Sequence, residues 1–122
     1  MSTQPFTPQG NTVAVTVTGT SSTAVQAPNI QGVGLGSGQY TVTNIGTQTV
    51  FIVATNARQS DGSLTTAAQA AAAVIPVNGT PANGFPILAN TSQTLTFSPG
   101  AWFTAIASAT GSTLYLSPGD GQ

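Results

Sequence analysis

A strict two-residue alternation marks the first patterned segment of the chain, residues 11–18. Aliphatic side chains alternate with hydroxyl-bearing ones: Val13, Val15 and Val17 against Thr12, Thr16 and Thr18. Successive residues of a β-strand point to opposite faces, and β-branched residues favour strands. The alternation therefore predicts a strand with one buried and one solvated face. It excludes an amphipathic helix, whose apolar residues recur every three or four positions.

The same kind of pattern recurs along the rest of the chain. Further short strands, separated by turns rich in Gly, Pro and Asn, are predicted at residues 22–27, 39–44, 48–55, 93–97, 101–108 and 112–117. The connections Asn44–Gly46 and Thr110–Gly111 predict β-hairpins, and Ser-Pro-Gly triplets at 98–100 and 117–119 predict turns. Seven to eight such strands predict an all-β fold, namely an antiparallel β-sandwich or jelly-roll, or a small barrel.

The alternation also predicts which side chains face the core. Tyr40 and Val42 are expected to point inward, and the continuous apolar run Val50–Val53 indicates a strand buried on both faces. In the last two strands the opposed sets are Phe103, Ala105 and Ala107 against Trp102, Thr104 and Ile106, and Leu114 and Leu116 on either side of Tyr115.

Two stretches lack a strand pattern. Residues 1–10 predict an extended N-terminal arm anchored by Phe6, with a disordered tail as the alternative. Residues 11–122 then form a single domain with a long loop insertion at 56–91, and a loop of that length is usually functional. Within it, the Ala-rich stretch 65–73 predicts either a short helix or a loop laid over the sheet.

Ionisable side chains are nearly absent, which removes most chemistry. Arg58, Asp61 and Asp120 are the only residues with a formal charge, and there is no His, Cys or Lys. Acid–base and nucleophilic catalysis need such groups, and transition-metal sites need His or Cys. We therefore expect no enzymatic activity, no cofactor and no metal. A calcium site using Asp61 would be weak, because it would have little carboxylate charge.

Other binding functions are excluded on similar grounds. One Arg cannot neutralise several phosphates, so nucleic acid is not an expected partner. The glycine-rich stretch 31–38 has no following helix and no Lys-Ser/Thr pair, so it predicts a connection between strands and no nucleotide site. The longest apolar run, residues 70–77, contains Pro76 and is far too short to span a membrane. No secretion signal is present at the start, so synthesis in a cytoplasm is expected.

The surface chemistry favours close association with other proteins. The net charge is −1, and solvation must come from neutral residues such as the 21 Thr. Such a surface packs against neighbours without self-repulsion or desolvation of ions, so we expect a homo-oligomer, with a trimer favoured, or a high-copy assembly. The candidate partner contacts are the apolar anchors of the arm and the insertion, together with the insertion's two charges: Phe6, Arg58, Asp61, Phe85 and Ile87.

Two further patterns have alternative explanations. The aromatic side chains of Tyr40, Trp102 and Tyr115 could stack on sugar rings, but the same residues fit a core, which we favour. The threonines at positions 16, 18 and 20 are similar to flat ice-binding faces, but any strand with a polar outer face gives that pattern.

Three patches of the chain resemble a group of small virion proteins of tailed bacteriophages. The patches are Val13–Thr18, then Tyr40–Thr47 with Val50–Val53, and finally Ala105–Ala107 with Thr113–Gly121. They cover about half of the chain, and the insertion from Arg58 to Leu88 departs from the pattern. The resemblance implies an all-β structural protein of the virion, with a decoration or cement protein of the capsid as the first choice. The partners it implies are the major capsid protein or other virion proteins.

The resemblance leaves other positions in the virion open. A receptor- or glycan-binding domain of a fibre or tail tip is one alternative, and a component of the head–tail connection is another. The resemblance transfers no catalytic residue.

Overall fold

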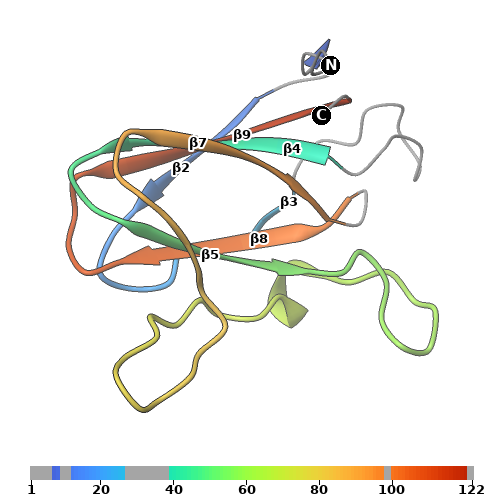
Figure 1. The fold of residues 1–122 in the computed structure, drawn as a ribbon. Helices are drawn as coiled ribbons and strands as arrows, with labels where there is room; N and C mark the ends of the chain where they lie inside the picture. The colour runs from blue at the N-terminus through green and yellow to red at the C-terminus, as the bar shows by residue number, and fades with distance from the viewer. Residues whose placement is uncertain (1–6, 9–11, 27–38, 98–99, 121–122) are drawn as a thin grey trace.

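Two antiparallel β-sheets lie face to face and enclose the core between them (Figure 1). The computed structural model describes residues 7–8, 12–26, 39–97 and 100–120. These residues form nine strands, of which β1 and β3 have only two residues each. Among the described residues the two sheets are open and do not close on each other, so the predicted all-β fold is confirmed as a sandwich rather than a barrel.

Sheet A contains five strands and carries both ends of the described chain. In the order β1-β9-β4-β7, each strand pairs with the next, and β2 also pairs with β9. The strands are β1 (Thr7–Pro8), β2 (Val13–Val17), β4 (Gln39–Gly46), β7 (Thr91–Thr96) and β9 (Ser112–Asp120).

Sheet B contains four strands in the order β3-β8-β5-β6. They are β3 (Val25–Gln26), β5 (Val50–Thr55), β6 (Phe85–Ile87) and β8 (Trp102–Ala107). The short strand β6 pairs only with Val50–Ile52, so the second half of β5 has no strand beside it on that side within the described part of the chain. Strand β6 lies inside the predicted insertion 56–91, which is therefore not loop throughout.

Most of the core consists of inward side chains that the alternation predicted, and Ile87 and Ala101 join them. Tyr40 and Val42 are buried, as are Leu114 and Leu116, whereas Tyr115 between the two leucines is exposed. An aromatic cluster closes one part of the core, because Phe103 contacts Tyr40 and Phe97 edge-on at ring-centroid distances of 5.5 and 5.0 Å. The buried cluster is Val15, Val17, Tyr40, Val42, Val50, Ile52, Ile87, Ala101, Phe103, Ala105, Ala107, Leu114 and Leu116.

Both predicted hairpins are wrong, since each connection crosses from one sheet to the other. Strand β4 lies between β9 and β7 in sheet A, whereas β5 lies in sheet B, and β8 and β9 are separated in the same way. The two crossing loops pack side by side: the Thr47 N–H donates to Gly111 O at 3.3 Å, and the Ser108 hydroxyl donates to Gln48 Oε1 at 2.9 Å. Gly46 has a φ of 144°, and a Cβ there would collide with Gly111 O, so this close approach requires glycine.

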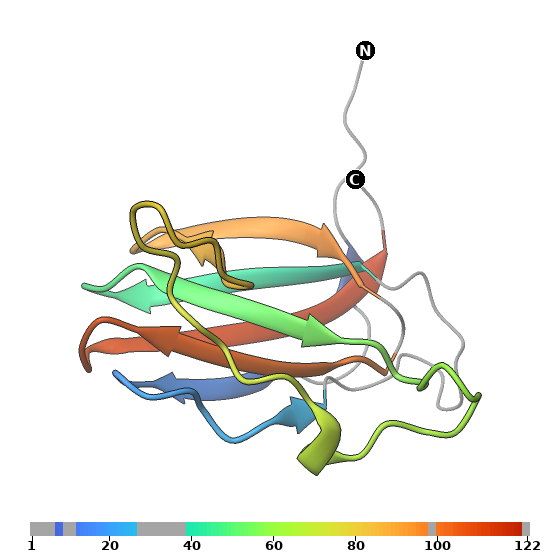
Figure 2. The ribbon, with the colours of Figure 1, turned by 90° about the horizontal axis from the view of Figure 1, so that it is seen from below.

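The structure also tests three predictions of local structure. The stretch 65–73 contains only a short 3-10 turn, Ala67–Gln69, so the alternative of a loop laid over the sheet is correct (Figure 2). The predicted turn at 117–119 is wrong, because β9 continues through it while pairing with β4. Of the predicted arm, Thr7–Pro8 pair with the end of β9, and the rest lies outside the described residues, as does the glycine-rich stretch 31–38.

Candidate functional site

The chain between β5 and β6, residues 56–84, crosses the outer face of sheet B (Figure 2), and we call it the inserted segment. Outward side chains of the sheet bind its backbone. The Trp102 indole N–H donates to Thr65 O at 2.9 Å, and the Thr104 hydroxyl donates to Ala71 O at 2.7 Å. The backbone N–H groups of residues 71 and 73 donate to the hydroxyls of Thr55 and Ser21, both at 2.9 Å. The inserted segment is therefore fixed to the sheet at several points.

Both charges of the inserted segment lie in its first loop, but each has its own partner. The Arg58 guanidinium donates to Gly62 O at 2.8 Å. Asp61 Oδ1 accepts hydrogen bonds from the Ser63 hydroxyl at 2.6 Å and from the Ser63 backbone N–H at 3.0 Å. These two bonds favour the ionised carboxylate and lower the pKa of Asp61 below its ordinary value. Arg58 and Asp61 thus stabilise the loop that carries them, and both remain exposed.

Large apolar side chains are exposed mainly on and just after the inserted segment. Leu64 is 66% exposed and Val77 is 61% exposed. Five of the seven large apolar residues that are exposed in the described chain fall between positions 64 and 88, namely Leu64, Val74, Val77, Phe85 and Leu88. We call these five residues the insertion surface. Sequence reasoning identified Phe85 but not the others as contacts, although apolar residues in an otherwise polar loop were a usable signal.

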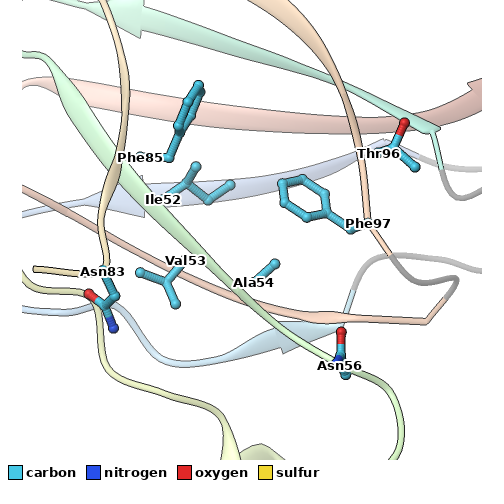
Figure 3. Close-up of a pocket in the computed structure, with 8 residues that line it drawn as sticks. All are labelled: Ile52, Val53, Ala54, Asn56, Asn83, Phe85, Thr96 and Phe97. Carbon is cyan, nitrogen blue, oxygen red and sulfur yellow. The ribbon is translucent and has the colours of Figure 1, made fainter.

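An open pocket of about 660 Å³ lies where the short β6 leaves β5 uncovered. Figure 3 shows Phe97, just after β7, reaching toward Ile52 of β5, with Phe85 beside them. Asn83 at the rim is held by the inserted segment, since its Nδ2 donates to Ala72 O and its Oδ1 accepts from the Val74 N–H, both at 3.0 Å. The lining is Ile52, Val53, Ala54, Asn56, Asn83, Phe85, Thr96 and Phe97. The pocket therefore offers an apolar floor, neutral amides and no titratable group.

The predicted contact residues differ in how exposed they are in the structure. Arg58, Asp61 and Phe85 are exposed, whereas Phe6 lies outside the described residues. Ile87 is completely buried in the core, so the expectation that it contacts a partner is corrected: it pairs with Val50 of β5 and belongs to the core cluster. The structure brings Arg58 and Asp61 into one loop and places Phe85 in β6.

The aromatic candidates are largely accounted for by the fold. Tyr40 is 2% exposed, and burial raises the pKa of its hydroxyl above the ordinary value, against a smaller opposing effect of a hydrogen bond with the Gly100 backbone. Trp102 is half-buried beneath the inserted segment and its N–H is already bonded. Tyr115, on the outer face of sheet A, is 38% exposed and is the most accessible of the three.

Comparisons with known protein families, with curated proteins and with solved structures give no match. Among the described residues, no three His, Cys, Asp or Glu side chains come together as a metal site would require. Within that same part of the chain, no helix is long and apolar enough to cross a membrane. The arrangement that remains is a neutral sandwich with an apolar insertion surface and an apolar pocket beside it.

Proposed function

We propose that the protein is a non-enzymatic structural subunit that attaches to other protein subunits through neutral and apolar contacts. Within this class we propose a decoration or cement protein of a bacteriophage capsid, bound to the major capsid protein or to neighbouring virion proteins. The virion is then its site of action.

The insertion surface is the observation that supports this proposal. Leu64, Val74 and Val77 belong to a segment that is fixed to sheet B by hydrogen bonds, yet their side chains are more exposed than buried. The five residues follow one another along a single stretch of the chain, 64–88, and exposed apolar side chains on a fixed segment can supply a protein–protein contact. Because the segment is already fixed, little conformational entropy is lost when a partner covers it.

The contact chemistry also predicts how attachment responds to salt. Besides Arg58 and Asp61, which form bonds within their own loop, the inserted segment has only neutral side chains. Apolar contacts are not weakened by screening, and at about 1 M salt the screening length falls to about 3 Å. Attachment should therefore persist in high salt and weaken in urea, which solvates apolar and peptide groups.

The receptor- or glycan-binding alternative receives less support from this geometry. Trp102 is one of the three aromatic side chains that could stack on a sugar, but the inserted segment half-buries it and accepts its N–H bond. A glycan site would then depend on Tyr115, which lies on the opposite sheet from the inserted segment.

The test is quantitative mass spectrometry of purified particles that carry the chain, before and after washing in high salt. A high copy number that survives the wash supports a shell-bound decoration protein. A low copy number points instead to the connector or the tail tip, and release by salt alone, or absence from the particles, contradicts the proposal. A glycan array with the purified protein serves as the parallel control for the alternative function.

A further inference from the structure

The outer edge of β7 is unpaired within the part of the chain that the structure describes. β7 pairs with β4 through six consecutive residue pairs, from Gln39 with Thr96 to Asn44 with Thr91, and no described strand pairs with its other side. Natural edge strands are usually protected by charge, proline, a bulge or very short length. β7 contains no charged residue, proline or glycine, and its pairing is unbroken. By contrast, the edge strand β6 of sheet B has three residues and contains Pro86.

A row of hydroxyl groups crosses the outer face of sheet A and ends at this edge. Pairing between the strands aligns Ser117 with Thr41 and Thr41 with Thr94. The hydroxyls of Thr41 and Thr94 are 3.2 Å apart, and those of Thr43 and Ser92 are 2.8 Å apart in the neighbouring row. A hydroxyl can donate one hydrogen bond and accept two, so Thr94 retains capacity for a further partner beyond the edge.

We propose that β7 pairs with β7 of a second copy of the chain, antiparallel and about a twofold axis beside Thr94. A twofold axis perpendicular to the sheet places the outer faces of both copies on the same side. Residues whose side chains point outward in one copy therefore pair with outward-pointing residues of the other copy. Thr94 then faces Thr94 of the second copy, and Ser92 faces Thr96. Cross-strand hydroxyl pairs of this kind are favourable, and no charge opposes the contact. Sheet A becomes a single sheet that runs through both copies.

The apolar pocket also favours a second copy at this edge. Thr96 and Phe97 line the pocket, so an added strand lies beside its mouth (Figure 3). The inward side chains of the second copy's β7 are Thr91, Gln93 and Leu95, all half-buried in the single chain. An axis at Thr94 sets Leu95 of one copy opposite Gln93 of the other, whereas an axis at Gln93 would oppose two half-buried amides. The two surfaces adjoin at Phe85, which lines the pocket. The β7 contact is nevertheless tested at Thr94, which is not part of the insertion surface, so the test is independent of the proposed function.

Strand β2 provides the competing edge and a matched control. Among the described strands it pairs with β9 alone, and it too contains neither charge nor proline. Its outward side chain Thr16 is exposed, like Thr94 on β7. A contact between β2 of one copy and β7 of the next would be head-to-tail and would extend into open chains, whereas the twofold contact closes as a dimer.

The first experiment is sedimentation velocity of the purified full-length protein over a range of concentrations in low and high salt. We expect a monomer–dimer equilibrium that salt does not weaken. Thr94→Lys, which sets two ammonium groups opposite each other, should remove the dimer at concentrations where the parent protein and Thr16→Lys remain dimeric. Circular dichroism and thermal unfolding of both variants verify that the fold is kept.

The second experiment uses the absence of cysteine from the chain. Directly opposite residues in antiparallel strands have Cα atoms about 4.5–5.5 Å apart, within the range that a disulfide spans. Thr94→Cys should therefore form a covalent dimer under mild oxidation, whereas Thr41→Cys, one strand inside the sheet, should not. The proposal is overturned by a monomer at every concentration, by a trimer, by open polymers, or by a dimer that survives Thr94→Lys. It is also overturned if Thr94→Cys fails to cross-link while the dimer persists.

Discussion

The side-chain amide of Asn44 in β4 donates a 2.9 Å hydrogen bond to the backbone carbonyl of Ile87 in β6, joining the two sheets through the core. Both residues are completely buried. The same amide nitrogen donates to Gln48 O at 2.8 Å, in the loop where the chain crosses from sheet A to sheet B. Asn44 thus satisfies two carbonyl groups near the crossing that distinguishes this sandwich from a set of hairpins.

Replacing Asn44 by alanine should destabilise the protein strongly. The variant removes the side-chain donor that the Ile87 and Gln48 carbonyl groups share, and an unsatisfied buried group costs about 1–3 kcal/mol in addition to the cavity left behind. We expect a loss of about 2–4 kcal/mol in the free energy of unfolding, measured by urea denaturation. Thr43→Ala, at the neighbouring outward position, is the control and should cost much less. Equal losses in the two variants would contradict a special role for Asn44.

Releasing the inserted segment from sheet B should be detectable by proteolysis. Arg58 is the only site for trypsin in the chain, so every cut reports on the first loop of the segment. Trp102→Phe and Thr104→Val each remove one bond to the segment, at a cost of about 1 kcal/mol each. We expect faster cleavage at Arg58 in both variants, with unchanged circular dichroism. Cleavage at the parental rate would show that these bonds do not fix the segment.

Substituting the exposed apolar residues should weaken attachment to a partner without changing the stability of the fold. Leu64→Ser and Val77→Ser change side chains that are mostly exposed, so we expect stability to stay within about 0.5 kcal/mol of the parent. Binding to particles that lack the chain should fall markedly in both. Ile45→Ser is the matched control, because Ile45 is 52% exposed but lies at the end of β4 in sheet A. If all three variants bind equally well, the insertion surface is not the contact.

The free energy of unfolding should be nearly independent of pH from mildly acidic to mildly alkaline conditions, because the chain has no His, Cys, Lys or Glu. Burial raises the pKa of Tyr40 in the folded state. The contribution of Tyr40 is therefore complete below the unfolded pKa of about 10 and is lost as the pH rises through the folded value. Asp61 acts at the acid end: its folded pKa is lowered, so its contribution is present above the unfolded pKa of about 3.9 and is lost as the pH falls.

The measurement is urea denaturation at a series of pH values. Tyr40→Phe removes the phenolic proton and should flatten the alkaline limb, while leaving the acid limb unchanged. An alkaline limb of the same depth in this variant would assign the loss to another group.

The sequence alone determined which side chains of a strand face the core, because this depends on the alternation of residues two positions apart. Val15 and Val17 face inward because the pleat of a strand sends alternate side chains to one side, and the same local rule places Leu114 and Leu116 inward and Tyr115 outward. Near-absence of charge was likewise readable from the chain alone, and it limits the surface to neutral contacts. Both features depend on the chemistry of the residues themselves and not on what they meet across space.

The tertiary structure decided everything that depends on the partner of each strand. A hairpin and a crossing between sheets give the same inward and outward alternation, so Asn44–Gly46 carried no local signal that β4 and β5 belong to opposite sheets. Ile87 was expected at a contact, but its burial follows from pairing with Val50 in sheet B. Backbone groups of the Ala-rich stretch 65–73 form hydrogen bonds with distant side chains such as Thr104. These bonds take the place of the helical hydrogen bonds, which so short a segment forms poorly. These outcomes depend on contacts between residues far apart in the sequence, and no local pattern encodes them.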